Sequence, residues 1–152
     1  MSIIWRKEMS VANEAIDQDH RYLFCLVNTV ELALRTEENR DLLDVAVTQL
    51  LEYTEYHFTR EKALQDKIQY PKRGDHRGEH LRIIEQVKTV QEQIRKALAP
   101  AQPEADADNP AKQVKLDADQ IAGLLREWVL GHVLKRDREM IPWLEQYPST
   151  YS

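Results

Sequence analysis

The sequence predicts an all-α protein, an antiparallel up-down four-helix bundle with an extended N-terminal arm. Apolar residues recur every three or four positions over four long stretches, and alternating strand patterns are almost absent. The links between the first three stretches are short, which places consecutive helices side by side and antiparallel. A chain of 152 residues is long enough to bury a sizeable core, so we expect one domain over residues 1–152.

The apolar stripes define helices at about residues 17–36, 40–67, 72–98 and 117–137. Asp17 is a suitable cap for the first helix, and Tyr70-Pro71 separates the second from the third. Residues 1–16 lack helical spacing, and we expect an arm whose Trp5 packs across one end of the bundle.

The remaining segments break the helical pattern. Residues 99–116 contain three prolines and several acidic residues, which predicts a mobile loop without a specific function, or a docking loop for a partner. Residues 138–152 are expected to close one end of the bundle with Met140, Ile141, Trp143 and Leu144. The only cysteine, Cys25, excludes an internal disulfide and is expected in or near the core.

Composition and charge indicate a globular protein and argue against a protein that binds nucleic acid or membranes. Charged residues make up 31% and hydrophobic residues 42%, which is typical of globular proteins. A net charge of −5 argues against binding to nucleic acid or to an anionic membrane. No apolar run approaches the roughly 20 residues that span a bilayer, and the N-terminus lacks the pattern of a signal peptide. We therefore expect a cytoplasmic protein that binds neither nucleic acid nor a membrane.

All five histidines belong to one set of inward-facing polar residues, together with two carboxylates. The set is His20, His57, Glu61, His76, His80, His132 and Asp137. Two pairs in it are spaced i,i+4 and therefore share a helix face. Each fragment alone is weak evidence, because a histidine on an apolar face is more often a hydrogen-bonded core residue, and a buried glutamate can pair with an arginine. Their occurrence on all four helices indicates a metal site.

The number of donors indicates two metal ions. Five imidazoles and two carboxylates exceed the four ligands of one tetrahedral zinc ion. If both carboxylates and one solvent-derived group bridge two ions, each ion has three donors. The five histidines then divide three and two, which leaves one ion with a vacancy for a small ligand. A redox-active pair that binds a diatomic molecule favours iron among the metals that imidazole binds.

The neighbours of this set are apolar, and we expect them to form a dry ligand pocket. They are Leu23, Phe24, Phe58, Leu64, Ile83, Ile84 and Trp128. A histidine-rich, carboxylate-poor site in such a pocket favours reversible binding of dioxygen over its activation. The spacing of His132 and Asp137 is less regular, because residues five apart point about 140° away from each other in an α-helix. Either the helix distorts there by a π-type turn, or the two side chains reach one centre from different angles.

Several motifs resemble those of the hemerythrin family, and within it the bacteriohemerythrins. They are Trp5 and Met9 in the arm, I-D-x-x-H (Ile16 to His20), H-F-x-x-E (His57 to Glu61), Y-P-x4-H-x3-H (Tyr70 to His80) and W-x3-H-x4-D (Trp128 to Asp137). Lys62, Gln65 and Ile83 depart from the acid, methionine and aromatic residue common in the family at these positions. The loop before the last helix is also longer than usual.

The resemblance implies two non-haem irons with unequal ligand sets. His76, His80 and His132 would hold one iron, and His20 and His57 the iron with the open position. Glu61 and Asp137 would bridge the pair together with an oxo or hydroxo group.

The implied function is reversible binding of O₂, without enzymatic turnover, for storage, delivery or sensing. Other small ligands could occupy the open iron. The alternatives are an oxygen or redox sensor that acts through a partner, a di-iron enzyme that reduces peroxide or nitric oxide, and a structural bundle with zinc or without metal.

Overall fold

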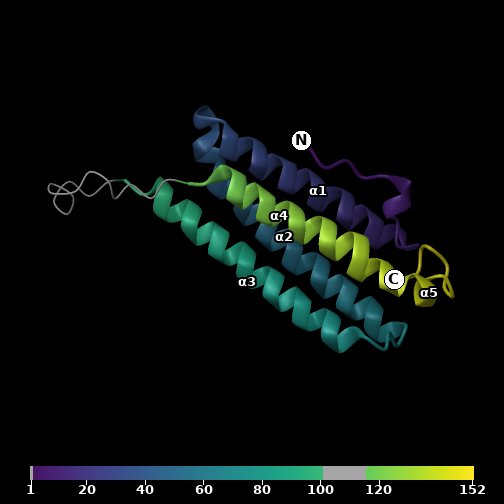
Figure 1. The fold of residues 1–152 in the computed structure, drawn as a ribbon. Helices are drawn as coiled ribbons and strands as arrows, with labels where there is room; N and C mark the ends of the chain where they lie inside the picture. Colours follow the sequence, from purple (N-terminus) through teal and green to yellow (C-terminus); the bar gives the residue numbers. More distant parts are fainter. Residues whose placement is uncertain (1, 101–115) are drawn as a thin grey trace.

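Four long helices form the protein (Figure 1), which a computed structural model describes over residues 2–100 and 116–152. They are α1 (Glu14–Arg35), α2 (Arg40–Lys67), α3 (Arg73–Leu98) and α4 (Ala118–Gly131). The chain continues from α4 into a π-helical turn, η4 (His132–Arg136), a 3₁₀ turn, η5 (Asp137–Met140), and the short helix α5 (Ile141–Leu144). Two further 3₁₀ turns, η1 (Lys7–Met9) and η2 (Glu37–Asn39), precede α1 and α2. No described residue lies in a strand, so the predicted all-α class is confirmed.

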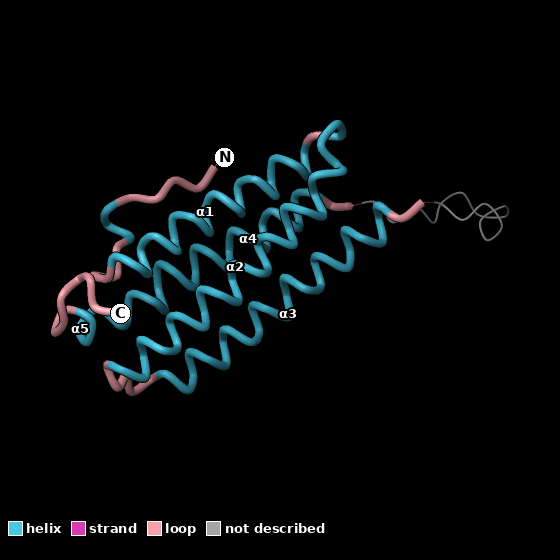
Figure 2. The backbone as a smooth tube through the Cα atoms, turned by 180° about the vertical axis from the view of Figure 1, so that it is seen from behind, coloured by secondary structure: helices cyan, strands magenta, loops and turns pink. Residues whose placement is uncertain are grey.

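Consecutive helices run antiparallel, as the views from the front and from behind both show (Figures 1 and 2). α1 packs against α2 and α4, α2 packs against α3, and the seam between α3 and α4 is the most open of the four. The starts of α1 and α3 and the ends of α2 and α4 therefore meet at one end of the bundle. α5 lies at this end (Figure 1).

The first helix begins at Glu14, earlier than predicted, because its cap is Asn13 rather than Asp17. The side-chain oxygen of Asn13 accepts a hydrogen bond from the backbone N–H of Ile16 at 3.1 Å. Asp17 instead ties the arm to the first turn of α1. Its carboxylate accepts hydrogen bonds from the hydroxyl of Ser10 at 2.5 Å and from the N–H of Val11 at 2.9 Å.

The N-terminal arm lies along α1 (Figure 1), and Trp5 packs beside Arg21 of that helix, so the expectation that Trp5 packs across one end of the bundle was wrong. Asn28 fixes the arm through two hydrogen bonds with the backbone of Ile3, one of 2.8 Å and one of 2.7 Å. The guanidinium of Arg21 sits 4.0 Å above the ring of Trp5. These contacts join residues far apart in sequence, and no local pattern of the arm reveals them.

Buried apolar residues form two clusters, one on either side of the polar set. The larger cluster, the bundle core, fills most of the space between the helices and includes Phe58 of α2. The smaller cluster, the end core, consists of Val11, Ile16, Leu64, Ile68, Tyr70, Met140 and Leu144. Ile141 and Trp143 pack against the end core, which confirms that the C-terminal segment closes this end. Glu61 lies between Phe58 and Leu64 in the sequence of α2, so the polar set lies where the two cores meet.

Cys25 is exposed, so the expectation of a position in or near the core was wrong. Successive helical residues are about 100° apart, and the buried side of α1 is already taken by Leu23, Phe24 and Val27. Cys25 therefore points away from the bundle.

The predicted loop 99–116 lies outside the described residues, apart from Ala99, Pro100 and Leu116. Within residues 2–100 and 116–152, no helix is both long enough and apolar enough to cross a membrane.

Leu50 should contribute strongly to stability because it is fully buried in α2, where truncation leaves a cavity. We predict that Leu50→Ala lowers the free energy of unfolding of the metal-free protein by about 2–5 kcal/mol. Leu42→Ala, at a position in the same helix that is 59% exposed, should change it by less than about 0.5 kcal/mol. Urea unfolding followed by circular dichroism measures both. Equal effects of the two substitutions would contradict the packing described here.

Candidate metal centre

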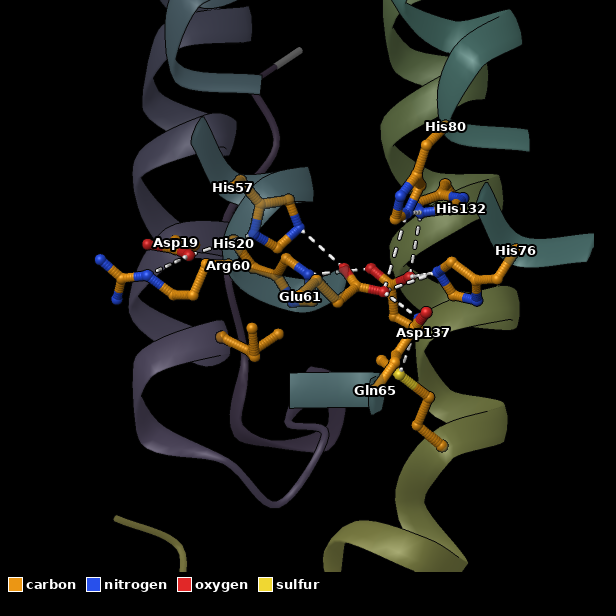
Figure 3. A network of polar contacts seen from close by, with 12 residues as sticks. Asp19, His20, His57, Arg60, Glu61, Gln65, His76, His80, His132 and Asp137 are labelled. Atoms are coloured by element: carbon orange, nitrogen blue, oxygen red, sulfur yellow. Dashed lines mark hydrogen bonds and ion pairs between the residues drawn. The ribbon is translucent and has the colours of Figure 1, made fainter. Parts of the chain in front are cut away.

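All seven residues of the predicted metal site lie together in the interior of the bundle (Figure 3). They come from every long helix and from the two turns after α4: His20 (α1), His57 and Glu61 (α2), His76 and His80 (α3), His132 (η4) and Asp137 (η5). Each is at most 5% exposed. Burial of two carboxylates and five imidazoles is costly unless their charges and lone pairs are compensated.

The potential ligand atoms form two groups that share both carboxylates. One group contains Glu61, His76, His80, His132 and Asp137, and the other contains His20, His57, Glu61 and Asp137. Within each group the ligand atoms lie within 4.8 Å of one another. The tertiary structure therefore divides the histidines three and two, as the count of donors predicted.

The two carboxylates face histidines of both groups. Glu61 Oε2 lies 3.2 Å from His57 Nε2, whereas its Oε1 lies 2.6 Å from His76 Nε2. Asp137 repeats this arrangement, with Oδ2 2.9 Å from His20 Nε2 and Oδ1 3.0 Å from His76 Nε2. Figure 3 shows both carboxylates in the middle of the cluster, between the two sets of imidazoles. This position suits a bridge between two centres.

The remaining histidines point their Nε2 atoms at each other. His80 Nε2 and His132 Nε2 are 3.0 Å apart, and His132 Nε2 also lies 3.0 Å from Asp137 Oδ1. The ring of Phe58 stacks on His80 with a centroid separation of 3.6 Å and fixes its orientation. Nε2 is therefore the atom that all five imidazoles direct into the cluster.

Buried polar atoms without a well-aligned hydrogen bond mark the centre of the cluster. They include His57 Nε2, His76 Nε2, Glu61 Oε2 and both carboxylate oxygens of Asp137. Buried polar atoms are normally paired, so such a concentration needs an explanation. Cations placed among these nitrogen and oxygen atoms would satisfy all of them, and imidazole with carboxylate is a donor set that iron and zinc accept. The residues present therefore fit a metal centre.

A π-helical turn brings His132 and Asp137 to the same centre. The backbone N–H of Asp137 donates to the carbonyl oxygen of His132, which is an i→i+5 bond. The wider turn places these two residues one above the other on the helix. The sequence left two explanations open for this spacing, and the structure confirms the helix distortion.

The predicted apolar lining is buried on both sides of the cluster. Leu23, Phe24, Phe58, Ile83, Ile84 and Trp128 belong to the bundle core. Leu64 belongs to the end core and lies on the other side of the polar set. A groove of about 450 Å³ along the open seam between α3 and α4 reaches Ile83, Trp128 and His132. The lining as a ligand pocket stays a prediction.

Residues 11–144 match the family model for the hemerythrin HHE cation binding domain. The chain belongs to the hemerythrin family. It is 26% identical to a bacteriohemerythrin of Clostridium acetobutylicum over 145 residues, which covers 91% of this chain and 98% of that protein. It is 27% identical to a bacteriohemerythrin of Ralstonia nicotianae over 144 residues, which covers 95% of this chain and 90% of that protein.

A solved structure of wild-type hemerythrin has a similar fold, with a TM-score of 0.73 and 21% identity. The likeness covers 93% of this chain and 97% of that one. The family and the helical bundle are thus shown, and the clustered histidines and carboxylates support a metal centre of the hemerythrin kind.

Of the departures from the usual hemerythrin pattern, Gln65 touches the metal centre and Lys62 does not. Gln65 is fully buried, and its amide Nε2 donates to Glu61 Oε1 at 3.0 Å and to Met140 Sδ at 3.4 Å. Lys62 is exposed on the outer face of α2. Gln65 therefore places a hydrogen-bond donor beside the shared carboxylate Glu61.

Two carboxylates that were not predicted from the sequence lie behind histidines of the site. Asp19 Oδ2 lies 3.1 Å from Nδ1 of His57, and Glu79 Oε1 lies 3.3 Å from Nδ1 of His132. Each acid directly precedes another histidine of the set in sequence but contacts one from a different helix. The adjacent Asp-His and Glu-His pairs were a signal that could have been noticed, although only the packing of helices reveals the true partners.

Proton affinities in the metal-free cluster follow from its buried carboxylates. Burial alone would lower the pKa of His57, but hydrogen bonds with Asp19 and Glu61 raise it to about 9. Burial also opposes the charged form of His76, yet its hydrogen bonds with Asp137 and Glu61 raise its pKa to about 9. For His132, the charge and hydrogen bond of Asp137 outweigh burial and raise the pKa to about 10.

His80 and the two shared carboxylates, Glu61 and Asp137, have lowered pKa values. Burial lowers the pKa of His80 to about 3. Burial and the charge of Asp137 would raise the pKa of Glu61, but hydrogen bonds with His57 and His76 hold it well below its usual range. In the metal-free protein near neutral pH, protons on histidines therefore compensate the buried carboxylates.

We predict that the metal-free protein is most stable near pH 6.5 and loses stability as the pH rises to about 9. Histidines whose pKa is raised stabilise the fold fully below pH 6.5, and this contribution is lost as the pH passes their folded-state values. The pKa of His80 is lowered, so this residue destabilises the fold as the pH falls below 6.5. Carboxyls with lowered pKa values stabilise the fold above pH 4.5, and this stabilisation is lost as the pH falls further.

Urea unfolding of chelator-treated protein at a series of pH values measures this profile. The metal-loaded protein is the control and should lack the decline above pH 6.5, because ions then replace the protons at Nε2. Stability of the metal-free protein that rises between pH 7 and 9 would contradict the assignment.

Proposed function

We propose that this protein binds dioxygen reversibly at a pair of non-haem irons and is not an enzyme. One observation carries the proposal: two groups of buried ligand atoms share both carboxylates but hold unequal numbers of histidines. Groups with equal numbers of histidines would favour two similar ions, each with a complete set of protein ligands. Unequal groups leave one ion short of a protein ligand, and that position can take a small molecule.

The proposed ligand assignment follows the two groups. His76, His80 and His132 hold one iron, and His20 and His57 hold the iron with the open position. Glu61 and Asp137 bridge the irons, together with an oxo or hydroxo group. When bound, the iron pair supplies electrons to dioxygen and recovers them on release. The names of the relatives from Clostridium acetobutylicum and Ralstonia nicotianae support a bacteriohemerythrin-like role.

Three features of the protein's own residues favour reversible binding of dioxygen. The apolar side chains of both cores exclude water from the site, which hinders the loss of bound oxygen as peroxide. Phe58 stacks on His80 and holds it in place. The amide of Gln65 donates to Glu61, which reduces the negative charge that this carboxylate offers to a metal. Lower charge donation disfavours high oxidation states of the irons.

A sensor that acts through a partner and an enzyme that reduces peroxide or nitric oxide remain the alternatives. No contact among the described residues specifically favours either of them. The binding of other small ligands and a cytoplasmic location also stay predictions.

Iron content together with visible spectra tests the proposal. We predict about two irons per chain, and an absorption band that forms when the reduced protein meets air and disappears when oxygen is removed. His57→Leu should abolish this oxygen-dependent band, because it removes a ligand of the open iron. Lys62→Ala, at an exposed position near Glu61 in the same helix, is the matched control and should keep it. Two bound irons without any reversible oxygen uptake would disprove the proposed function.

A further inference from the structure

We propose that Asp19 and Tyr53 are positioning residues that control how strongly His57 binds its metal ion. The inference rests on the proposed pair of metal ions. It assigns the control of the ion with the open position to a buried carboxylate that is itself not a ligand.

Each carboxylate oxygen of Asp19 contacts one of these side chains, His57 or Tyr53. Oδ2 lies 3.1 Å from Nδ1 of His57, and Oδ1 accepts a hydrogen bond of 2.7 Å from the hydroxyl of Tyr53. Asp19 is only 1% exposed. Because a carboxylate can only accept, it places the imidazole proton on Nδ1 and leaves the lone pair of His57 on Nε2. Nε2 is the atom that faces the shared carboxylate Glu61.

Tyr53 and Arg60 hold Asp19 in this position. Tyr53 is wedged between two other tyrosines, with ring centroids 4.5 Å from Tyr22 and 5.7 Å from Tyr56. Arg60 Nε lies 3.5 Å from Asp19 Oδ2 and compensates its charge. A buried carboxylate with two directed partners and a nearby cation has little freedom to rotate. The orientation of His57 is therefore fixed from the α1–α2 face of the bundle.

The two metal groups differ in this respect. In the three-histidine group, Glu79 backs His132 at 3.3 Å but is itself 25% exposed at its side chain. In the two-histidine group, His20 Nδ1 is buried without a hydrogen-bond partner among the described residues. His57 is thus the member of that pair whose Nδ1 is held by a carboxylate. An ion with only two histidines depends more on each of them, so Asp19 should matter most for the ion with the open position.

Zinc-loaded protein tests the inference without oxygen chemistry, because zinc is diamagnetic and binds imidazole. Stepwise zinc affinities come from competition with a chelator, and ¹⁵N spectra of the imidazoles show which histidines bind the metal and which nitrogen carries the proton. The variants are Asp19→Asn, which removes the charge but keeps the shape, and Tyr53→Phe, which removes one hydrogen bond. Glu79→Gln is the matched variant for the other ion, and Asp44→Asn removes a carboxylate from the surface as a control.

We expect Asp19→Asn to weaken zinc binding at His20 and His57 by about 10- to 100-fold, the range typical of such partners. The ¹⁵N signals that report zinc binding by His76, His80 and His132 should persist. Tyr53→Phe should weaken the same ion by a smaller factor, Glu79→Gln should weaken the other ion, and Asp44→Asn should change neither. Azide is a small ligand that can bind the iron with the open position. In the diferric protein, Asp19→Asn should lower the affinity for azide, whereas Glu79→Gln should leave it unchanged.

Two results would overturn the inference. One is an Asp19→Asn variant with unchanged zinc affinity and an unchanged Nδ1 proton on His57. The other is equal weakening of the same ion by Asp19→Asn and Glu79→Gln. If Asp19→Asn does not fold, Tyr53→Phe alone decides, and unchanged affinity in that variant counts against the inference. If the wild-type protein binds only one zinc ion and only one iron, both the proposed function and this inference fail. If it binds two ions but Asp19→Asn leaves zinc affinity unchanged, only this inference fails.

Discussion

The two shared carboxylates, Glu61 and Asp137, impose the constraint on which the rest of this structure depends. Both are fully buried, and uncompensated negative charge in a protein interior is costly. The five imidazoles around them supply the compensation, by protons in the metal-free protein and by ligation when cations are bound. Protons and metal ions therefore compete for the same Nε2 atoms, so the chemistry of the site and the stability of the bundle are linked.

The fold satisfies this constraint by enclosing the polar set between two apolar clusters. The bundle core separates it from the far end of the helices, and the end core, closed by Met140 and Leu144, separates it from solvent at the near end. Antiparallel topology lets all four helices contribute at this depth. The π-helical turn η4 adds the last adjustment, since it aligns Asp137 with His132. A wider ring of partners, including Asp19, Glu79 and Gln65, then differentiates the two groups of ligands.

Much of the candidate site could be predicted because its residues interrupt strong helical patterns. Glu61 in the stripe of α2 and the unusual spacing between His132 and Asp137 were visible without coordinates, and the structure explains both. The failures concern contacts between distant residues. Asp17 looked like a helix cap but binds the arm, and Trp5 packs along α1 because Asn28 captures the backbone of Ile3. Asp19 passed unnoticed because its partner His57 lies on another helix.

The sequence by itself determined the helices, the seven inward-facing polar residues and the odd number of histidines, since these follow from local periodicity and composition. The grouping of the histidines was implied by the resemblance to the hemerythrin family, but residue spacing alone did not give it. The tertiary structure places their ligand atoms in two groups, because this depends on how four helices are arranged in space. It also decided which acids back which imidazoles. Asp19 precedes His20 but holds His57, and Glu79 precedes His80 but contacts His132. Neighbours along a helix point in different directions, so the partner of a buried side chain is chosen by the helix packed against it.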